Sequence, residues 1–132
     1  MLGSWPTFTD RNGVLIPIEL DQLPFVPKRV FYVTNVPKGE ERGNHAHYTT
    51  EQILTCIQGE IIVKLHNGTK LETVTLKPNQ WTFIDKLIWD SQIFVTGNDI
   101  LMSICSSIYN KSDYIEDFDI FKRIVGALIC KN

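Results

Sequence analysis

The amino-acid sequence predicts an all-β domain with one short helix near its C-terminal end. Between residues 14 and 106, short runs rich in Val, Ile, Thr, Phe and Tyr are separated by turn residues about every 8 to 12 positions, a spacing typical of antiparallel sandwiches and barrels. Helical periodicity is nearly absent from this region. The amphipathic stretch at residues 118–128 predicts a short helix. We therefore expect a single β-barrel that carries one helix.

The predicted strands, in chain order, are residues 14–19, 29–35, 45–48, 52–58, 60–66, 70–76, 80–84, 92–95 and 100–106. Asn67-Gly68 is the favoured pair of a type I′ hairpin, so the runs on either side of it are expected to pair as antiparallel neighbours. Within residues 60–66, Ile61, Val63 and Leu65 alternate with mainly polar side chains. This period of two predicts one face in the core and one face in contact with water.

Composition limits the class of protein. The chain has 132 residues, 43% of them hydrophobic, so residues 1–132 are expected to form one domain with a single core. The formal net charge of −2 provides no basic surface for nucleic acid. The apolar runs are far shorter than the ~20 residues of a membrane span, and we expect a cytoplasmic protein. Cys56, Cys105 and Cys130 are odd in number and widely spaced, which predicts buried apolar side chains and not disulfides.

Two of the three histidines, His45 and His47, are two residues apart. On a strand, this spacing directs both imidazoles to the same face. Because imidazole exchanges protons near neutral pH, such a pair is suited to general acid and base catalysis, or to metal binding. The alternative is a pair of surface histidines on an edge strand.

The spacing of glycines around this pair resembles the first motif of the cupin superfamily. Gly39 is followed by five residues, then by His45-x-His47, and then by eleven residues and Gly59. The resemblance implies a small cupin, a jelly-roll barrel of the double-stranded β-helix type with a site inside it. Metal-binding cupins add a glutamate and a third histidine, whereas this chain has Gln52 at the glutamate position and its last histidine, His66, beside a predicted turn. We therefore expect a site without metal or cofactor.

A narrower resemblance, to the dTDP-sugar 3,4-ketoisomerases, covers nearly the whole chain. The matching segments are Asp10-Arg11-Asn12-Gly13, Pro24-Phe25, residues 28–33, residues 42–47, Thr50-Glu51-Gln52 and residues 113–118. The resemblance implies that the enzyme converts dTDP-4-keto-6-deoxyglucose to its 3-keto isomer. The resemblance further implies that a transaminase then converts the product into a 3-amino sugar for surface polysaccharide such as lipopolysaccharide O-antigen. It also implies a homodimer, for which exchange of the N-terminal strands is one arrangement.

This reaction moves a carbonyl group from C4 to C3 by proton transfer, and His45 and His47 are the candidates to share the acid and base tasks. Asp90 follows Trp89 where family members usually have a histidine. We expect it either to orient an imidazole and raise the pKa of that histidine, or merely to cap a loop.

Four further residues are candidates for contacts with the substrate. The phenol of Tyr32 is a candidate to bond a sugar oxygen or relay a proton, or else it is a core or rim residue. The guanidinium groups of Arg42 and Arg29 suit the diphosphate, although surface ion pairs with Glu40 or Glu41 are the alternative. Gln52 is expected to bind substrate.

Other functions stay open at this stage. One is a non-catalytic cupin that binds a nucleotide sugar. Others are a 3,5-epimerase type of cupin, which also acts on 4-keto sugars, and a metal-dependent cupin oxygenase.

Overall fold

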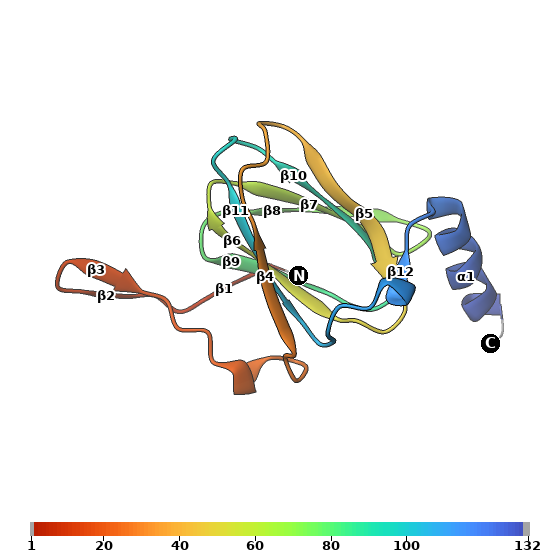
Figure 1. Ribbon diagram of the computed structural model, residues 1–132, viewed down its shortest axis with the longest axis horizontal. Coiled ribbons are helices and arrows are strands. Elements are labelled where there is room, and N and C mark those ends of the chain that lie inside the picture. The colour runs from red at the N-terminus through yellow and green to blue at the C-terminus, as the bar shows by residue number, and fades with distance from the viewer. Residues whose placement is uncertain (1, 131–132) are drawn as a thin grey trace.

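The computed structural model describes residues 2–130, which form two packed antiparallel sheets and a C-terminal helix (Figure 1). The strands of the first sheet, in spatial order, are β1 (Leu2–Ser4), β9 (Gln80–Ile84), β6 (Gln52–Gln58), β11 (Ile100–Cys105) and β4 (Arg29–Val33). Those of the second are β12 (Tyr114–Ile115), β5 (Glu41–His47), β10 (Trp89–Phe94), β7 (Ile61–His66) and β8 (Leu71–Leu76). This is the cupin-like sandwich, so the predicted fold class is confirmed.

The main core fills the space between the two sheets. Ile61, Val63 and Leu65 of β7 all point into it, as their alternation predicts. They pack there with a set of apolar side chains from both sheets: Val36, Leu54, Cys56, Leu76, Ile84, Phe94 and Leu101. Burial of this apolar surface is the main force that holds the two sheets together.

A second, smaller core lies outside the second sheet. Helix α1 (Phe118–Cys130) packs Phe121 against Ala46 of β5 and Ile115 of β12, and all three side chains are buried. The predicted helix is therefore confirmed. Because Ala46 lies between His45 and His47 on β5, the helix closes the back of the strand that carries both histidines.

Several predicted boundaries are wrong. The single strand expected at residues 14–19 is instead a hairpin of β2 (Phe8–Asp10) and β3 (Gly13–Leu15), followed by the 3-10 turn η1 (Leu20–Gln22). Strand β4 ends at Val33 because Asn35 has a φ of 61°. Strand β5 starts at Glu41 and not at residue 45, and it ends before Tyr48. Strands β1, β2 and β12 were not predicted because two or three residues are too few to show a period.

The hairpin between β7 and β8 exists, but its turn differs from the predicted one. His66 pairs with Leu71, so four residues form the loop instead of the two of a type I′ turn. The Asn67 side chain explains the longer loop, because its Oδ1 accepts hydrogen bonds from the backbone of Thr69 and Lys70, each at 2.8 Å.

Gly59, the last glycine of the cupin spacing, has a structural reason to be glycine. Its φ is +82°, and a Cβ at this position would collide with the carboxylate of Asp99. That carboxylate accepts backbone hydrogen bonds from Glu60, Thr96 and Gly97. A side chain here would disrupt the junction that connects β6, β7 and β11.

Two of the predictions from composition concern the cysteines and membrane-spanning segments. Cys56 and Cys105 are buried and free, as predicted, while the side chain of Cys130 lies outside the part described. Among residues 2–130, no helix has the length and apolar content needed to cross a membrane.

Candidate active site

A β-bulge in strand β5 determines which way the two histidines point. Asp90 of β10 is opposite His45, but the next residue of β10, Ser91, is opposite Gly43, so Asn44 is the extra residue. Gly43 and Asn44 have φ values of 93° and 62°. A Cβ on Gly43 would lie 3.1 Å from the backbone oxygen of Asp90, so the positive φ and the close approach both favour glycine. Beyond the bulge, His45 faces the interior of the sandwich.

A cavity of about 380 Å³ opens between the sheets beside this bulge. Six of the residues predicted from the sequence line it: Arg29, Tyr32, Arg42, His45, Gln52 and Asp90. Gln92 and Tyr114 line it as well. His47 lies in a smaller adjoining pocket that shares Arg29, Gln52 and Tyr114 with the cavity. The topology therefore brings all the predicted side chains to one region.

The two imidazoles are in contact with each other and with one phenol. Their ring centroids are 5.0 Å apart, and the ring of Tyr114 lies edge-on at 5.1 Å from His45 and 4.5 Å from His47. Strand β5 is paired on both sides, with β10 and with β12, and His47 is only 4% exposed. The alternative of surface histidines on an edge strand is therefore wrong.

Burial keeps both imidazoles neutral. It lowers the pKa of His47 to about 4, with His45 and Arg29 acting in the same direction and Asp113 opposing them. Burial also lowers the pKa of His45, against the opposing effects of Glu116 and of the Gly43 backbone. At neutral pH each ring therefore has one nitrogen free to accept a proton and one N–H to donate.

Asp90 reaches the same cavity from β10. Its side chain is 1% exposed, and its Oδ2 accepts a 2.5 Å hydrogen bond from Nε2 of Gln92. Its Oδ1 is 4.0 Å from Nε2 of His45 and has no hydrogen-bond partner within residues 2–130. Asp90 therefore lies on a strand and not in a loop, and one oxygen of its carboxyl group lies beside an imidazole.

The protonation of Asp90 differs from the sequence-based expectation. Burial raises the pKa of its carboxyl group to about 7, although the hydrogen bond from Gln92 acts to lower it. We expected Asp90 to raise the pKa of a histidine, yet the net shift of the His45 pKa is downward. The expectation fails because both groups are buried, and the loss of water is the largest cause of each pKa shift.

The two arginines differ in how firmly they are held. The guanidinium carbon of Arg29 lies 4.7 Å from the ring centre of Phe31 and 5.2 Å from that of Tyr109, so two aromatic rings hold this cation in place. Arg42 is exposed at the cavity mouth. The ion pair considered between an arginine and Glu41 is replaced by one from Lys64, at 3.1 Å.

Gln52 and Tyr32 occupy contrasting positions. Gln52 is buried at the cavity wall, where its Nε2 lies 3.4 Å from the sulfur of Cys105. Tyr32 is 72% exposed, and the alternation of β4 places it on the outward face with Val30. It therefore lines only the rim of the cavity.

Comparison with known proteins identifies the family. The sequence matches the family described as "FdtA: WxcM-like, C-terminal" over residues 2–126. The chain belongs to the dTDP-sugar 3,4-ketoisomerase family. It is 31% identical over 121 residues to TDP-4-oxo-6-deoxy-alpha-D-glucose-3,4-oxoisomerase of Aneurinibacillus thermoaerophilus. The match covers 90% of this chain and 87% of the relative. Family membership makes the protein an enzyme, a nucleotide-sugar 3,4-ketoisomerase, as the sequence predicts.

Solved structures of this family have the same fold. QdtA, a sugar 3,4-ketoisomerase from Thermoanaerobacterium thermosaccharolyticum crystallised with TDP, matches with a TM-score of 0.90 at 29% identity, covering 97% of this chain and 95% of that one. A 3,4-ketoisomerase from Helicobacter canadensis matches with a TM-score of 0.90 at 31% identity, covering 96% of each chain.

Three residues of this ketoisomerase site were not singled out from the sequence. Gln92 lies two residues after Asp90, so the strand period alone would have placed it on the same face. Tyr114 and Asp113 lie far along the chain, and only the pairing of β12 with β5 brings Tyr114 opposite His47. The carboxylate of Asp113 fixes the segment after β5 by accepting hydrogen bonds from Thr49 and Thr50. The 3-10 turn η2 (Lys111–Asp113) delivers it there.

A metal site needs several ligating side chains close together. No group of three or more His, Cys, Asp or Glu side chains within residues 2–130 has an arrangement that would hold a metal ion. His66, the third histidine, instead accepts a 2.9 Å hydrogen bond from the backbone of Gly68 through its Nδ1, within the loop that joins β7 and β8.

The raised pKa of Asp90 leads to a prediction about stability. Between its ordinary pKa of 3.8 and about 7, the folded chain holds a proton that the unfolded chain has released, so this group contributes less stability as pH rises through that window. Above pH 7 the loss is constant, about 4 kcal/mol at most. Asp90→Asn removes this loss and can still accept the bond from Gln92, so we expect the variant to be more stable than the native chain at pH 8.

Urea unfolding of both proteins from pH 4 to pH 8 measures the effect. The stability difference should grow in favour of Asp90→Asn as the pH rises and should nearly vanish at pH 4. A difference that does not change with pH would show that Asp90 titrates normally in the folded protein.

Proposed function

We propose that this ketoisomerase acts on dTDP-4-keto-6-deoxyglucose and moves its carbonyl group from C4 to C3. The observation that carries the proposal is the pair of neutral imidazoles, one of them lining a cavity of about 380 Å³ that also holds arginines. Relatives provide support, because QdtA has been crystallised with TDP and a histidine-to-asparagine variant of QdtA with TDP-4-keto-6-deoxyglucose.

We assign to His45 the transfer of protons to and from the carbon atoms of the sugar. His45 lines the cavity and its side chain is 23% exposed, whereas His47 is 4% exposed and lies in the pocket behind. Neutral His45 takes the proton from C3, and the electrons of that C–H bond form the C3=C4 double bond while the C4 oxygen gains a proton. In the second half, the C3 hydroxyl loses a proton, which balances the one gained by the C4 oxygen, the C3 carbonyl forms, and the electrons of the C3=C4 bond take up at C4 the proton held by His45. No electrons leave the sugar, so the sequence of steps is balanced without an oxidant or a cofactor.

His47 and Asp90 support this exchange in different ways. Because the pKa of His47 is about 4, His47 is neutral at neutral pH. His45 therefore has no positively charged imidazole beside it. When His45 holds the substrate proton, the ionised fraction of Asp90, with its Oδ1 4.0 Å from Nε2 of His45, stabilises the imidazolium. Rigid placement of these groups in a site with little water strengthens their electrostatic effect.

The remaining predicted residues are assigned to binding. Arg29, held between two aromatic rings, and Arg42, at the cavity mouth, provide guanidinium groups for the diphosphate. The amide of Gln52 is assigned to a sugar hydroxyl, and the exposed phenol of Tyr32 to the rim. We further propose that the protein works in the cytoplasm and that its product serves a transaminase in the synthesis of surface polysaccharide.

The experiment that tests the proposal is NMR of the sugar product formed from dTDP-4-keto-6-deoxyglucose in D₂O. We expect a product with its ketone at C3 and deuterium at C4. His45→Asn should lower turnover by about 10²- to 10⁴-fold, the range for removal of a general acid or base, while still binding TDP. TDP binding by the variant is the control for folding.

Two results would contradict the assignment. A product that keeps its ketone at C4 would indicate a 3,5-epimerase. No turnover and no deuterium exchange by the native protein would indicate a nucleotide-sugar-binding protein without catalysis.

We also propose that two copies of the chain form a dimer through the N-terminal hairpin. Within residues 2–130, strands β2 and β3 pair only with each other, and they extend away from the sandwich (Figure 1). Their large apolar side chains Phe8, Val14 and Leu15 are 55%, 55% and 65% exposed. An isolated two-stranded hairpin is marginally stable, and this much exposed apolar surface favours a covering partner.

Sedimentation velocity tests the dimer. The native chain should sediment as a dimer, and Leu15→Asp should sediment as a monomer because a buried carboxylate would oppose association. Leu128→Asp changes a leucine on helix α1 that is 46% exposed, and this control should remain a dimer. A native chain that is monomeric at micromolar concentration would overturn the proposal.

A further inference from the structure

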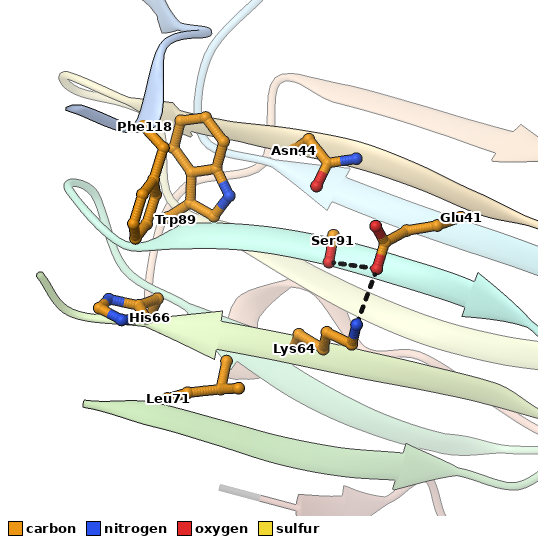
Figure 2. A pocket seen from close by; sticks show the side chains of 8 residues that line it. All are labelled: Glu41, Asn44, Lys64, His66, Leu71, Trp89, Ser91 and Phe118. Atoms are coloured by element: carbon orange, nitrogen blue, oxygen red, sulfur yellow. Dashed lines mark hydrogen bonds and ion pairs between the residues drawn. The ribbon is translucent and has the colours of Figure 1, made fainter. Parts of the chain in front are cut away.

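The outer face of the second sheet has a groove that the isomerase reaction does not use. Its volume is about 180 Å³, and Figure 2 shows the eight side chains that line it: Glu41, Asn44, Lys64, His66, Leu71, Trp89, Ser91 and Phe118. The strands are shared with the active site but the faces are opposite. On β10, Trp89 and Ser91 point outward into the groove, while Asp90 and Gln92 point inward to the cavity.

One end of the groove is apolar and rigid. The indole of Trp89 and the ring of Phe118 meet edge to face, with centroids 5.2 Å apart. The imidazole of His66 meets Phe118 in the same manner at 5.0 Å. Leu71, which is 53% exposed, completes this end from β8. The rings line this end of the groove with aromatic surface, and Trp89 is supported from behind because it also contacts the buried Phe121.

The other end is polar and electrically balanced. Oε2 of Glu41 lies 3.1 Å from Nζ of Lys64 and accepts a 3.1 Å hydrogen bond from the Ser91 hydroxyl. The hydrogen bond from Lys64 is the main cause of a lowered Glu41 pKa, so the carboxylate is ionised at neutral pH. The amide of Asn44, placed outward by the β-bulge, lies beside this pair (Figure 2). One negative and one positive charge cancel, which disfavours an ionic ligand.

The size of the groove further limits which ligands it can hold. A cavity of roughly 150 Å³ is enough to hold one benzene ring, whereas sites for drug-sized molecules start at about 300 Å³. The groove therefore has room for one six-membered ring and is too small for a nucleotide sugar.

From these features, we propose that the groove is a second binding site, for the pyranose ring of a neutral 6-deoxyhexose. The ring would place its C–H face and its methyl group against Trp89 and Leu71, and its hydroxyl groups against Glu41, Asn44 and Ser91. A carboxylate, an amide and a hydroxyl provide the acceptors and donors that sugar hydroxyls require, and the aromatic surface fits the apolar face of the ring. This site does not depend on the isomerase assignment, because no groove residue lines the inner cavity.

The test is an NMR titration of the full-length protein with methyl 6-deoxy-α-D-glucopyranoside. The indole N–H of Trp89, assigned with Trp89→Phe, should shift and saturate with a dissociation constant in the millimolar range, as expected for a single small ring. Methyl α-D-glucopyranoside, which has a hydroxyl in place of a hydrogen at C6, should bind severalfold more weakly because its C6 hydroxyl must be desolvated against the aromatic surface.

Variants at the polar end separate this site from the active site. Glu41→Ala and Ser91→Ala should each weaken binding five- to tenfold, whereas Glu72→Ala, an exposed carboxylate of β8 outside the groove, should have no effect. Backbone spectra of the three variants report whether the fold is kept, and either polar-end variant alone is sufficient for the comparison.

Three results would overturn the proposal. The first is no saturable shift of the Trp89 indole up to tens of millimolar sugar. The second is a shift that both polar-end variants leave unchanged. The third is binding that perturbs Gln92 and Gln52 but not the indole, which would place the sugar in the inner cavity alone.

Discussion

The exclusion of water from the last three residues of strand β5, His45, Ala46 and His47, is the constraint on which the rest of the site depends. The strand is paired along both edges, with β10 and β12, and helix α1 covers its outer face at Ala46, which is fully buried. Its inner face carries His45 and His47. Because burial is the largest cause of the lowered pKa of both rings, the packing around β5 establishes the chemistry of the pair. The C-terminal segment therefore matters for function although α1 lines no part of the inner cavity.

Asp90 illustrates how the same burial acts on an acid. Losing water raises the pKa of a carboxyl group and lowers that of an imidazole, so burial shifts the pKa of Asp90 upward to about 7 and the pKa of His45 downward. A carboxyl group that titrates near neutral pH can take up and release a proton, which suits a reaction that removes a proton at one carbon and returns one at the next. A buried carboxyl group with one oxygen unpartnered reduces stability, and its presence here agrees with a functional role.

The sequence predicted those features that depend on local period and on composition. The alternation in residues 60–66 placed Ile61, Val63 and Leu65 in the core, and the spacing of His45 and His47 placed both on one face. Features that depend on contacts between distant segments were missed. The position of Tyr114 beside both histidines results from the pairing of β12, which has only two residues and no detectable period. The bulge at Gly43 and Asn44 was missed because it depends on the register with β10.

The direction of a pKa shift also could not be predicted from the sequence, because it depends on how much water reaches the titrating group. The sequence led us to expect Asp90 near an imidazole, and its Oδ1 lies 4.0 Å from Nε2 of His45, but we also expected attraction between charges to raise the pKa of that histidine. Burial of both partners reverses that expectation. The same limit applied to Tyr32, whose outward position follows from the register of the edge strand β4 and not from its own neighbours in the sequence.

An NMR titration of the imidazole nitrogens of His45 and His47 in the native protein tests most directly whether burial keeps this pair neutral. His47 should remain neutral until the pH falls to about 4, and His45 should become protonated only below the ordinary histidine value of 6.5. If either ring takes up a proton at or above pH 6.5, water reaches β5 in solution, and neutral imidazoles cannot be the basis of the site.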